Sequence, residues 1–341
     1  MYFFIGYESD WSKLAFYPHL TTHLANLTNF IRAGSPDAPK PLEGRAAMSS
    51  PTDQDPDFPP LVMTFAASDP SGGAGIQADI LTLASMGCHP LSVLTAITVQ
   101  DTMGVEAVQA IDADWVADQA RCLLEDMPVD AFKIGALGSV ENIAAIAEIL
   151  SDYPDVPLIL DPVLASGRGD ELASDEMLHA MRELLLPQTT ILTPNSLEAR
   201  RLADTEDEDE PLLSVCAQRL IDIGCEFVLV TGTHEPTTQV VNTLYGKSGV
   251  VRSDSWQRLP GSYHGSGCTL ASAIAAMLAN GLELPEAVRE AQDYTWHTLQ
   301  KAYRPGMGQM LPDRLFWARE EEEEPRVEDA VPPQSSNLHR H

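Results

Sequence analysis

The fold is decided by the stretch LVMTFAASDPSGGAGIQAD, residues 61–79. Its first half is an apolar run of strand character, and a turn with three glycines then leads into a segment of helical character that begins at Ile76. A strand, a glycine-rich turn and a helix in succession are typical of an α/β sheet. Such sheets bind their ligands beyond the carboxyl ends of the strands. We therefore expect the chemistry of this chain where a strand gives way to a helix.

The alternation of strand and helix continues to residue 302. Apolar runs predict strands at 61–66, 92–98, 131–134, 158–160, 191–193, 227–230 and 240–245. Helical periodicity predicts helices at 76–86, 113–125, 140–150, 175–185, 197–202, 213–223, 268–278 and 285–302. The pattern predicts one three-layer α/β/α domain over residues 60–319, whose mostly parallel sheet is covered by helices on both faces.

The two ends of the chain differ from this pattern. Residues 1–59 lack sustained periodicity and become rich in Pro, Ser, Asp and Gly, which predicts a flexible extension. Residues 320–341 open with five consecutive glutamates and stay polar, which predicts an acidic, disordered tail.

The chain is strongly acidic, with a formal net charge of −29 over 341 residues. This charge argues against nucleic acid as a partner, because Lys and Arg supply most of the affinity for phosphate backbones. It also disfavours an anionic membrane surface, and no apolar stretch is long enough to span a bilayer. A protein of this charge that binds phosphate groups needs local N–H groups, metal ions or a few placed cations.

The five cysteines are widely spaced, and no two of them form a C-x-x-C motif. This usage indicates neither a disulfide framework nor a zinc site, and it favours the reducing cytoplasm. Glu8 and Asp10 interrupt the apolar start of the chain, so we expect no secretion signal there.

The first motif is the glycine turn that follows the first strand. Its glycines let the backbone approach a ligand closely, and Asp69 is a candidate partner for a ligand hydroxyl or ring nitrogen. The spacing matches neither the dinucleotide-binding fingerprint nor a Walker A motif. A tight turn that only caps a helix is the competing interpretation.

The second motif is Thr193-Pro194-Asn195-Ser196-Leu197-Glu198, at the end of a buried strand. A helix cap at Ser196 would explain it structurally. Alternatively, Asn195 and Glu198 lie near a magnesium ion and its waters, because Mg²⁺ prefers oxygen ligands. Asp161, directly after strand 158–160, is a further carboxylate for this metal.

The third motif is a glycine-rich turn before a long run of small residues, GSYHGSGCTLASA at 261–273. The free N–H groups and positive dipole end of the predicted helix suit phosphate oxygens, as phosphoryl transfer requires. A small-residue helix packed on the sheet is the alternative.

Cys268 lies in the first turn of this predicted helix, where the helix dipole favours a thiolate that could act as a base. A buried structural cysteine is the competing interpretation.

Together these motifs resemble the hydroxymethylpyrimidine and phosphomethylpyrimidine kinases of thiamine biosynthesis, a branch of the ribokinase superfamily. The resemblance covers residues 60–319 and extends to LTAITVQDTMGV at 94–105, Lys133-Ile134-Gly135 and Leu160-Asp161-Pro162-Val163. It implies a ribokinase-like fold and a cytoplasmic enzyme that uses ATP and Mg²⁺ to phosphorylate the pyrimidine's hydroxymethyl group and then the resulting monophosphate. Homodimers are usual in the family. A pyridoxal kinase of the same fold is the nearest alternative, and a non-catalytic pyrimidine-binding protein is a more distant one.

The resemblance also assigns roles to residues. Gln100 would hydrogen-bond the aminopyrimidine through its amide, and it is the main discriminator from a pyridoxal kinase. The remaining substrate contacts fall to Asp69, Ala66, Gly73 and Val163. The transferred phosphoryl group would be surrounded by Gly265, Gly267 and Cys268. The nucleotide side is assigned to Asn195, Arg168, Thr231 and Gly232, and the metal to Glu198 and Asp161.

Three departures from the family pattern concern the pocket and the nucleotide. The segment ASGRGD at 165–170 replaces the commoner alanine-lysine-serine-glycine-aspartate, so Arg168 is expected to supply the nucleotide-facing cation. Ala136 stands where a methionine often contacts the ring. TGTH at 231–234 replaces lysine-glycine-glycine-histidine and removes one phosphate contact. ATP binding would then rely on Arg168, magnesium and backbone donors.

Overall fold

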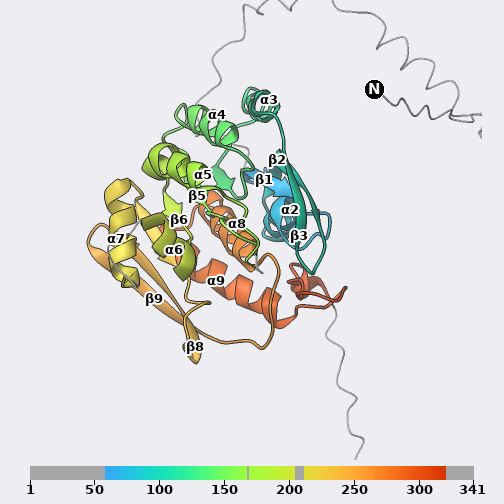
Figure 1. The fold of residues 1–341 in the computed structure, drawn as a ribbon, viewed down its shortest axis with the longest axis vertical. Helices are drawn as coiled ribbons and strands as arrows, with labels where there is room; N and C mark the ends of the chain where they lie inside the picture. Colours follow the sequence, from blue (N-terminus) through green and yellow to red (C-terminus); the bar gives the residue numbers. More distant parts are fainter. Residues whose placement is uncertain (1–57, 167–168, 204–210, 320–341) are drawn as a thin grey trace, which may run out of the picture. The chain divides into compact units, whose positions relative to one another are not determined.

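A computed structural model describes residues 58–166, 169–203 and 211–319 (Figure 1). The predicted extension, apart from its last two residues, lies outside these ranges, as do the predicted tail at 320–341 and Arg168. No helix within the described ranges combines the length and apolarity needed to cross a bilayer.

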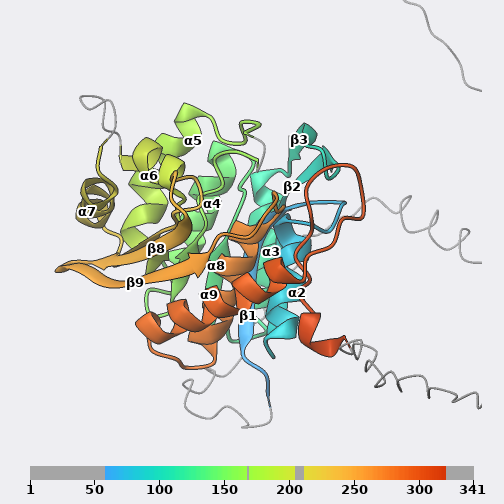
Figure 2. The same cartoon turned by 90° about the horizontal axis from the view of Figure 1, so that it is seen from below.

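Strands of the described residues form one nine-stranded sheet in the order β3-β2-β1-β4-β5-β6-β7-β8-β9. The six central strands, β2 to β7 in this order, pair in parallel, whereas β3, β8 and β9 are antiparallel to their neighbours. The hairpin of β8 and β9 is seen in Figure 2. The strands are β1 (Leu61–Ser68), β2 (His89–Gln100), β3 (Val105–Ala110), β4 (Ala131–Ile134), β5 (Leu158–Leu160), β6 (Ile191–Leu192), β7 (Phe227–Val230), β8 (Gln239–Gly246) and β9 (Gly249–Gln257).

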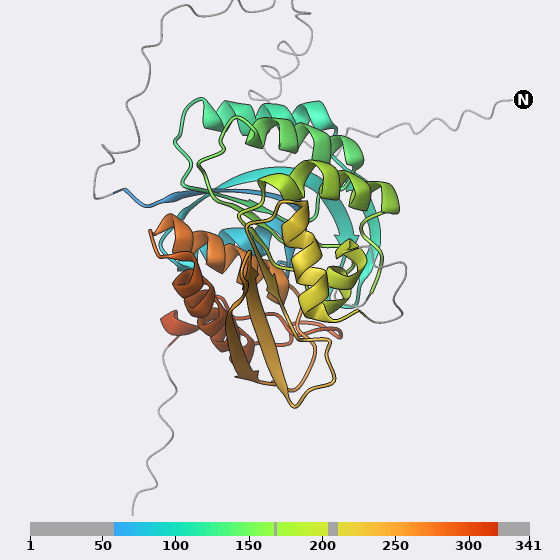
Figure 3. The ribbon, with the colours of Figure 1, turned by 90° about the vertical axis from the view of Figure 1, so that its left-hand side faces the viewer.

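Helices cover both faces of the sheet (Figure 3). One face packs against α3, α4, α5, α6 and α7, and the other against α2, α8 and α9. Neighbouring residues of β1 show the alternation, because Met63 joins the first core and Val62 the second. The helices are α2 (Gly75–Ser85), α3 (Ala113–Leu124), α4 (Val140–Leu150), α5 (Asp175–Ala180), α6 (Ser196–Ala203), α7 (Leu213–Ile223), α8 (Ser266–Ala279) and α9 (Leu284–Gln300).

The predicted α/β fold is confirmed, and each predicted strand and helix is present. Helix α5 ends earlier than predicted and continues as a π-helical stretch, Met181–Leu185. Strands β3 and β9 are not among the strands predicted from the sequence. Both lie at edges of the sheet and expose most of their side chains, so they lack the apolar run that marks a buried strand.

A buried ion pair joins Lys133 of β4 to Asp79 of α2. The Nζ atom of Lys133 lies 2.9 Å from both carboxylate oxygens of Asp79, and neither side chain reaches solvent. Thr64 of β1 and Ser272 of α8 donate hydrogen bonds to the same carboxylate, at 2.6 and 2.8 Å. Burial acts to lower the pKa of Lys133, but the charges of Asp79, Cys268 and Asp161 and the hydrogen bond to Asp79 together outweigh burial and raise the pKa, so the lysine is charged. The pair and its hydrogen bonds therefore link β1 and β4 to α2 and α8, two helices on one face of the sheet.

We expect the substitution Lys133→Met to lower the free energy of unfolding by about 3–5 kcal/mol, because it leaves the Asp79 carboxylate buried without its partner. Urea denaturation followed by circular dichroism measures the change. The matched control is Arg121→Met, which breaks an ion pair whose side chains are 51% and 75% exposed and should cost less than about 1 kcal/mol. Equal losses in the two variants would contradict this prediction.

Candidate active site

Two glycine turns meet at the carboxyl edge of the sheet. The first follows β1, and the second ends at Gly265, which caps the amino end of α8 with a left-handed backbone, φ 77°. A Cβ atom on Gly265 would overlap the carbonyl oxygen of Gly73 in the first turn. Gly265 therefore has to be glycine for two reasons, its positive φ and this close approach.

The amino end of α8 opens into a cavity about 710 Å³ in volume. The cavity is lined by Gly265, Gly267 and Cys268, and also by Asp161, Asn195 and Glu198. The N–H groups in the first turn of a helix have no partner within the helix, and the helix dipole makes this end attractive to anions. The residues predicted for phosphate and metal thus share one cavity.

The second cavity is smaller, about 70 Å³, and lies beside the first. Its lining includes the predicted substrate residues Ala66, Asp69, Gln100 and Val163. Val163 and Cys268 line both cavities. Cys268 therefore lies at the junction between the predicted substrate side and the predicted phosphate side.

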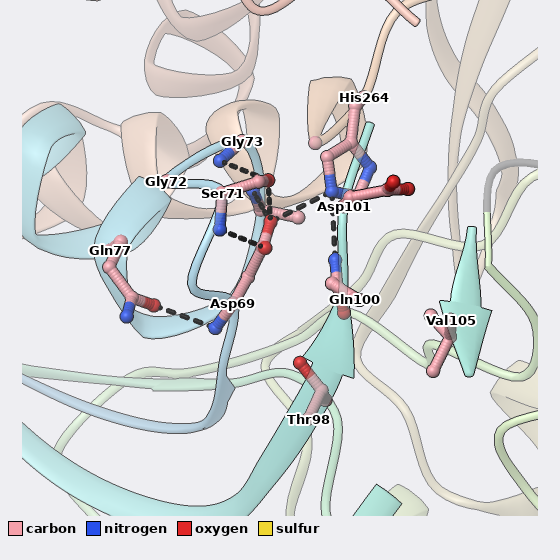
Figure 4. A network of polar contacts seen from close by, with 12 residues as sticks. Asp69, Ser71, Gly72, Gly73, Gln77, Thr98, Gln100, Asp101, Val105 and His264 are labelled. Atoms are coloured by element: carbon pink, nitrogen blue, oxygen red, sulfur yellow. Dashed lines mark hydrogen bonds and ion pairs between the residues drawn. The ribbon is translucent and has the colours of Figure 1, made fainter. Parts of the chain in front are cut away.

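A polar network organises the substrate side (Figure 4). The carboxylate of Asp69 accepts hydrogen bonds from the N–H groups of Ser71 and Ala74, at 2.8 and 2.7 Å, so it shapes its own glycine turn. The Nε2 atom of His264 lies 2.8 Å from Asp69 Oδ2 and 3.0 Å from the amide nitrogen of Gln100. Burial acts to raise the pKa of Asp69, but the hydrogen bonds from His264 and Ser71 outweigh it, and the pKa is lowered. Asp69 is therefore ionised and anchors this network.

His264 was not predicted as a site residue. It is buried, with 8% of its surface exposed, and it joins the predicted substrate residues Asp69 and Gln100 although 164 or more positions separate it from them. The sequence feature that could have indicated a role for His264 is its position directly before Gly265, within the glycine-rich turn. A side chain on Gly73 would overlap the His264 ring, so Gly73 makes room for this histidine.

Cys268 and Asp161 form a buried, hydrogen-bonded pair in the wall of the larger cavity, where phosphate is predicted to bind. Burial raises the pKa of the Cys268 thiol to about 12, against a weaker opposing effect of Lys133. The expected lowering of this pKa by the helix dipole is therefore wrong for the ligand-free protein. Burial also raises the pKa of Asp161 to about 6, although Lys133 and a hydrogen bond from the Cys268 thiol act to lower it. The thiol is thus protonated and donates to the carboxylate.

Asn195 and Glu198 cap helix α6 reciprocally. The side-chain oxygen of Asn195 accepts hydrogen bonds from the N–H groups of Leu197 and Glu198, and a Glu198 carboxylate oxygen accepts from the N–H of Asn195 at 2.9 Å. This is a capping box, with Asn195 and not Ser196 as the cap. Burial and the charge of Asp161 nevertheless raise the pKa of Glu198 to about 8. Glu198 thus lies beside a second carboxyl group, and no cation of the described residues acts to lower its pKa.

The carboxyl groups of Asp161, which is buried, and Glu198, which is half-buried, line one cavity and fit a magnesium ion, which takes few ligands from a protein and completes its shell with water and phosphate oxygens. No group of three or more His, Cys, Asp or Glu side chains in the described part of the chain is arranged to hold a metal. Asp161 and Glu198 would accordingly need the nucleotide phosphates to complete such a site.

Thr231 and Gly232, which are also predicted to bind the nucleotide, lie in different surroundings. Thr231 lines the large cavity, and its N–H donates to the carbonyl of Pro194 at 2.9 Å, next to Asn195. The N–H of Gly232 donates to Asn242 Oδ1 at 3.1 Å, and a Cβ on Gly232 would overlap the carbonyl of Val241. Gly232 is thus engaged in packing the β7 end against β8, whereas Thr231 faces the cavity.

Comparisons with known proteins identify the family of this chain. The sequence model of the family described as phosphomethylpyrimidine kinase matches residues 69–313. A relative from Mycobacterium bovis named hydroxymethylpyrimidine/phosphomethylpyrimidine kinase is 41% identical over 261 residues, which cover 76% of this chain and 94% of the relative. A relative of the same name from Escherichia coli is 36% identical over 243 residues, 70% of this chain and 91% of the relative.

Solved structures similar to this chain include kinases for two kinds of small ring compound. Phosphomethylpyrimidine kinase from Clostridium difficile is 35% identical, with a TM-score of 0.61, and the match covers 69% of this chain and 97% of that one. Pyridoxal kinase from Bacillus subtilis, solved with ADP, is 28% identical with a TM-score of 0.70, over 76% of this chain and 98% of that one. The family match at residues 69–313 spans both glycine turns and the residues around Cys268, and the chain belongs to the phosphomethylpyrimidine kinase family.

Proposed function

We propose that this protein transfers the γ-phosphoryl group of ATP to the hydroxymethyl oxygen of 4-amino-5-hydroxymethyl-2-methylpyrimidine. A second transfer to the resulting monophosphate yields the diphosphate for thiamine diphosphate biosynthesis. The names of the relatives support this function, and one of them, 38% identical, is named thiamine biosynthesis bifunctional protein ThiED. The chain covers 50% of that bifunctional relative and 96% of the Streptomyces coelicolor kinase.

The observation that carries the proposal is the position of Cys268 at the junction of two unequal cavities. The larger cavity has room for a nucleotide, and a helix amino end and two carboxyl groups face it. The smaller cavity is lined mainly by apolar groups and ends at Gln100 and Asp69. An acceptor ring in the small cavity and ATP in the large one would bring the two reacting oxygens together beside α8.

We propose that the amino end of α8 binds the transferred phosphoryl group, with Gly265 and Gly267 allowing its close approach. Magnesium held by Asp161 and Glu198 would neutralise phosphate charge when it is bound. Asn195 orients Glu198 through the capping box, and Thr231 lies beside it on the nucleotide side. Arg168 remains our proposal for a nucleotide-facing cation.

The acceptor hydroxyl must lose a proton during transfer. The Cys268 thiol has a pKa raised to about 12 by burial, so it is a poor base in the ligand-free protein. Burial raises the pKa of Asp161 to about 6, but the magnesium proposed above would keep this carboxylate ionised, so Asp161 is not assigned as the base. We propose that Cys268 acts in the transfer as a protonated thiol that orients the Asp161 carboxylate.

A pyridoxal kinase is the second candidate, because the Bacillus subtilis structure has the higher TM-score, 0.70 against 0.61 for the Clostridium difficile pyrimidine kinase. Sequence identity favours the pyrimidine, at 35% against 28%. The amide of Gln100, held beside His264 and Asp69, offers the donors and acceptor that an aminopyrimidine needs.

ADP release in the presence of ATP and magnesium tests the substrate. We expect turnover with hydroxymethylpyrimidine and with its monophosphate, each with a kcat/KM about tenfold or more above that for pyridoxal, because buried polar groups left unpaired by the wrong ring cost affinity. Turnover of pyridoxal alone would overturn the assignment to thiamine biosynthesis.

The substitution Gly265→Ala tests the anion site. The new Cβ would push the amino end of α8 away from the Gly73 carbonyl, and we expect kcat/KM to fall about 100-fold or more. The matched control is Gly281→Ala, which bears a similar positive φ, 84°, but has no atom within 4 Å of the new Cβ. The control should keep its activity within about twofold. Equal activity in the two variants would show that the close approach of the turns is not needed for transfer.

The substitution Glu198→Gln tests the metal site through stability. The pKa of Glu198 is raised by burial from 4.5 to about 8, so the ligand-free wild type should lose stability as the pH rises from 4.5 to 8. Glutamine has no such loss, and we expect the Tm of the variant to exceed that of the wild type by about 5 °C at pH 8.5 and by little at pH 4.5.

Magnesium supplies the second half of this test. At pH 8.5 magnesium should raise the Tm of the wild type and leave that of Glu198→Gln nearly unchanged. Glu148→Gln is the control, because Glu148 has a side chain that is 75% exposed in an ion pair on α4. A Tm difference between Glu198→Gln and wild type that does not vary with pH would contradict the assignment.

We also propose that the enzyme works in the cytoplasm as a homodimer. The five free cysteines suit a reducing compartment, and the resembling kinases are usually dimers. Light scattering that gives the mass of a single chain would contradict the dimer, and recovery of the protein outside the cytoplasmic fraction would contradict the compartment.

A further inference from the structure

The segment after α9 carries a buried arginine that none of the predicted roles uses. This segment runs alongside α2 and β2 (red in Figure 2). Only 4% of the surface of Arg314 is exposed. Its backbone carbonyl accepts hydrogen bonds from the hydroxyl groups of Ser85 and Tyr294, at 2.7 and 2.8 Å, so the residue is fixed from both sides.

The guanidinium of Arg314 contacts both glycine turns. Its Nη2 atom donates to the carbonyl of Gly73 at 2.6 Å, and Nη1 donates to the carbonyl of Gly72 at 3.4 Å. Its Nε atom donates to Thr269 Oγ1 at 3.1 Å, and that hydroxyl in turn donates to the carbonyl of Gly265 at 2.8 Å. The arginine therefore reaches both partners of the close contact between Gly73 and Gly265.

No carboxylate of the described residues forms an ion pair with Arg314, although the chain carries many more acidic than basic residues. Burial lowers the pKa of Arg314, yet a guanidinium stays protonated in proteins. An unpaired buried charge is costly, and hydrogen bonds to three neutral oxygens offset only part of the cost. A counter-charge that arrives with a ligand would compensate it, and the anion site lies one helical turn from Thr269.

We propose that Arg314 is a positioning residue that holds the two glycine turns together through Gly73 and Thr269 and adds positive charge behind the amino end of α8. Its charge favours the phosphoryl group most in the transition state, when negative charge is concentrated next to α8. The turn that follows β1 keeps its shape without Arg314, because Asp69 holds it from within. The proposal rests on the phosphoryl transfer proposed above.

The substitution Arg314→Met keeps much of the volume and removes the charge, whereas Arg314→Lys keeps the charge and loses the forked geometry. We expect Arg314→Met to lower kcat about 10- to 100-fold while the KM values for pyrimidine and ATP change less than about threefold. Arg314→Lys should recover part of the lost kcat.

The substitution Thr269→Val removes the hydroxyl between Arg314 and Gly265 at almost constant volume. We expect it to lower kcat less than Arg314→Met does. The double variant should have the kcat of Arg314→Met alone within about twofold, because both changes interrupt one chain of hydrogen bonds. Additive losses would contradict the link through Thr269.

Tyr294→Phe is the matched control, because it loosens the same segment and leaves the guanidinium and its partners in place. It should lower the Tm while kcat stays within about twofold, with kcat measured well below the Tm of every variant. The proposal is overturned if Arg314→Met keeps its kcat, or if Tyr294→Phe lowers kcat as much. A wild type that phosphorylates neither pyrimidine would instead refute the proposed function, and the same variants would then be compared on the acceptor that it does use.

Discussion

The Lys133–Asp79 ion pair is the constraint on which the site depends. A charged pair without solvent exposure is favourable only when its geometry is good and its remaining hydrogen-bonding capacity is used. Asp79 meets this condition by accepting bonds from β1 and α8 as well as from Lys133. Any shift of α8 along the sheet would break these bonds, so the pair fixes where the helix begins, and with it the position of Cys268 and the Gly265 turn.

Much of the fold could be predicted from the sequence because its central strands are buried on both faces. Strands such as β4 and β7 consist almost entirely of buried residues, and their ends were predicted correctly. The edge strands could not be found in this way. Half of β9 is charged or polar, and its identity as a strand comes from its pairing with β8, a property of the folded sheet and not of a local pattern.

Site features that depend on neighbours in sequence were also predictable. The three-residue spacing of Asn195 and Glu198 brings both side chains to the start of α6, and the glycine turn before α8 marks a helix amino end. Features that depend on distant segments were not. The contact of His264 with Asp69 joins positions 195 apart, and the raised pKa of Cys268 follows from its burial under other elements, which outweighs the local effect of the helix.

The hydrogen bonds of Arg314 also bear on how the protein is made. Every strand of the sheet, and α8 itself, precedes this residue in the chain, so a ribosome can release all the described strands and α-helices of the domain before residue 314 emerges. During that interval the nascent chain has its sheet but lacks the link between its two glycine turns. If Arg314 acts as we propose, assembly of a competent site is one of the last events of synthesis, and a translation product interrupted before residue 314 would be folded in large part yet slow in phosphoryl transfer.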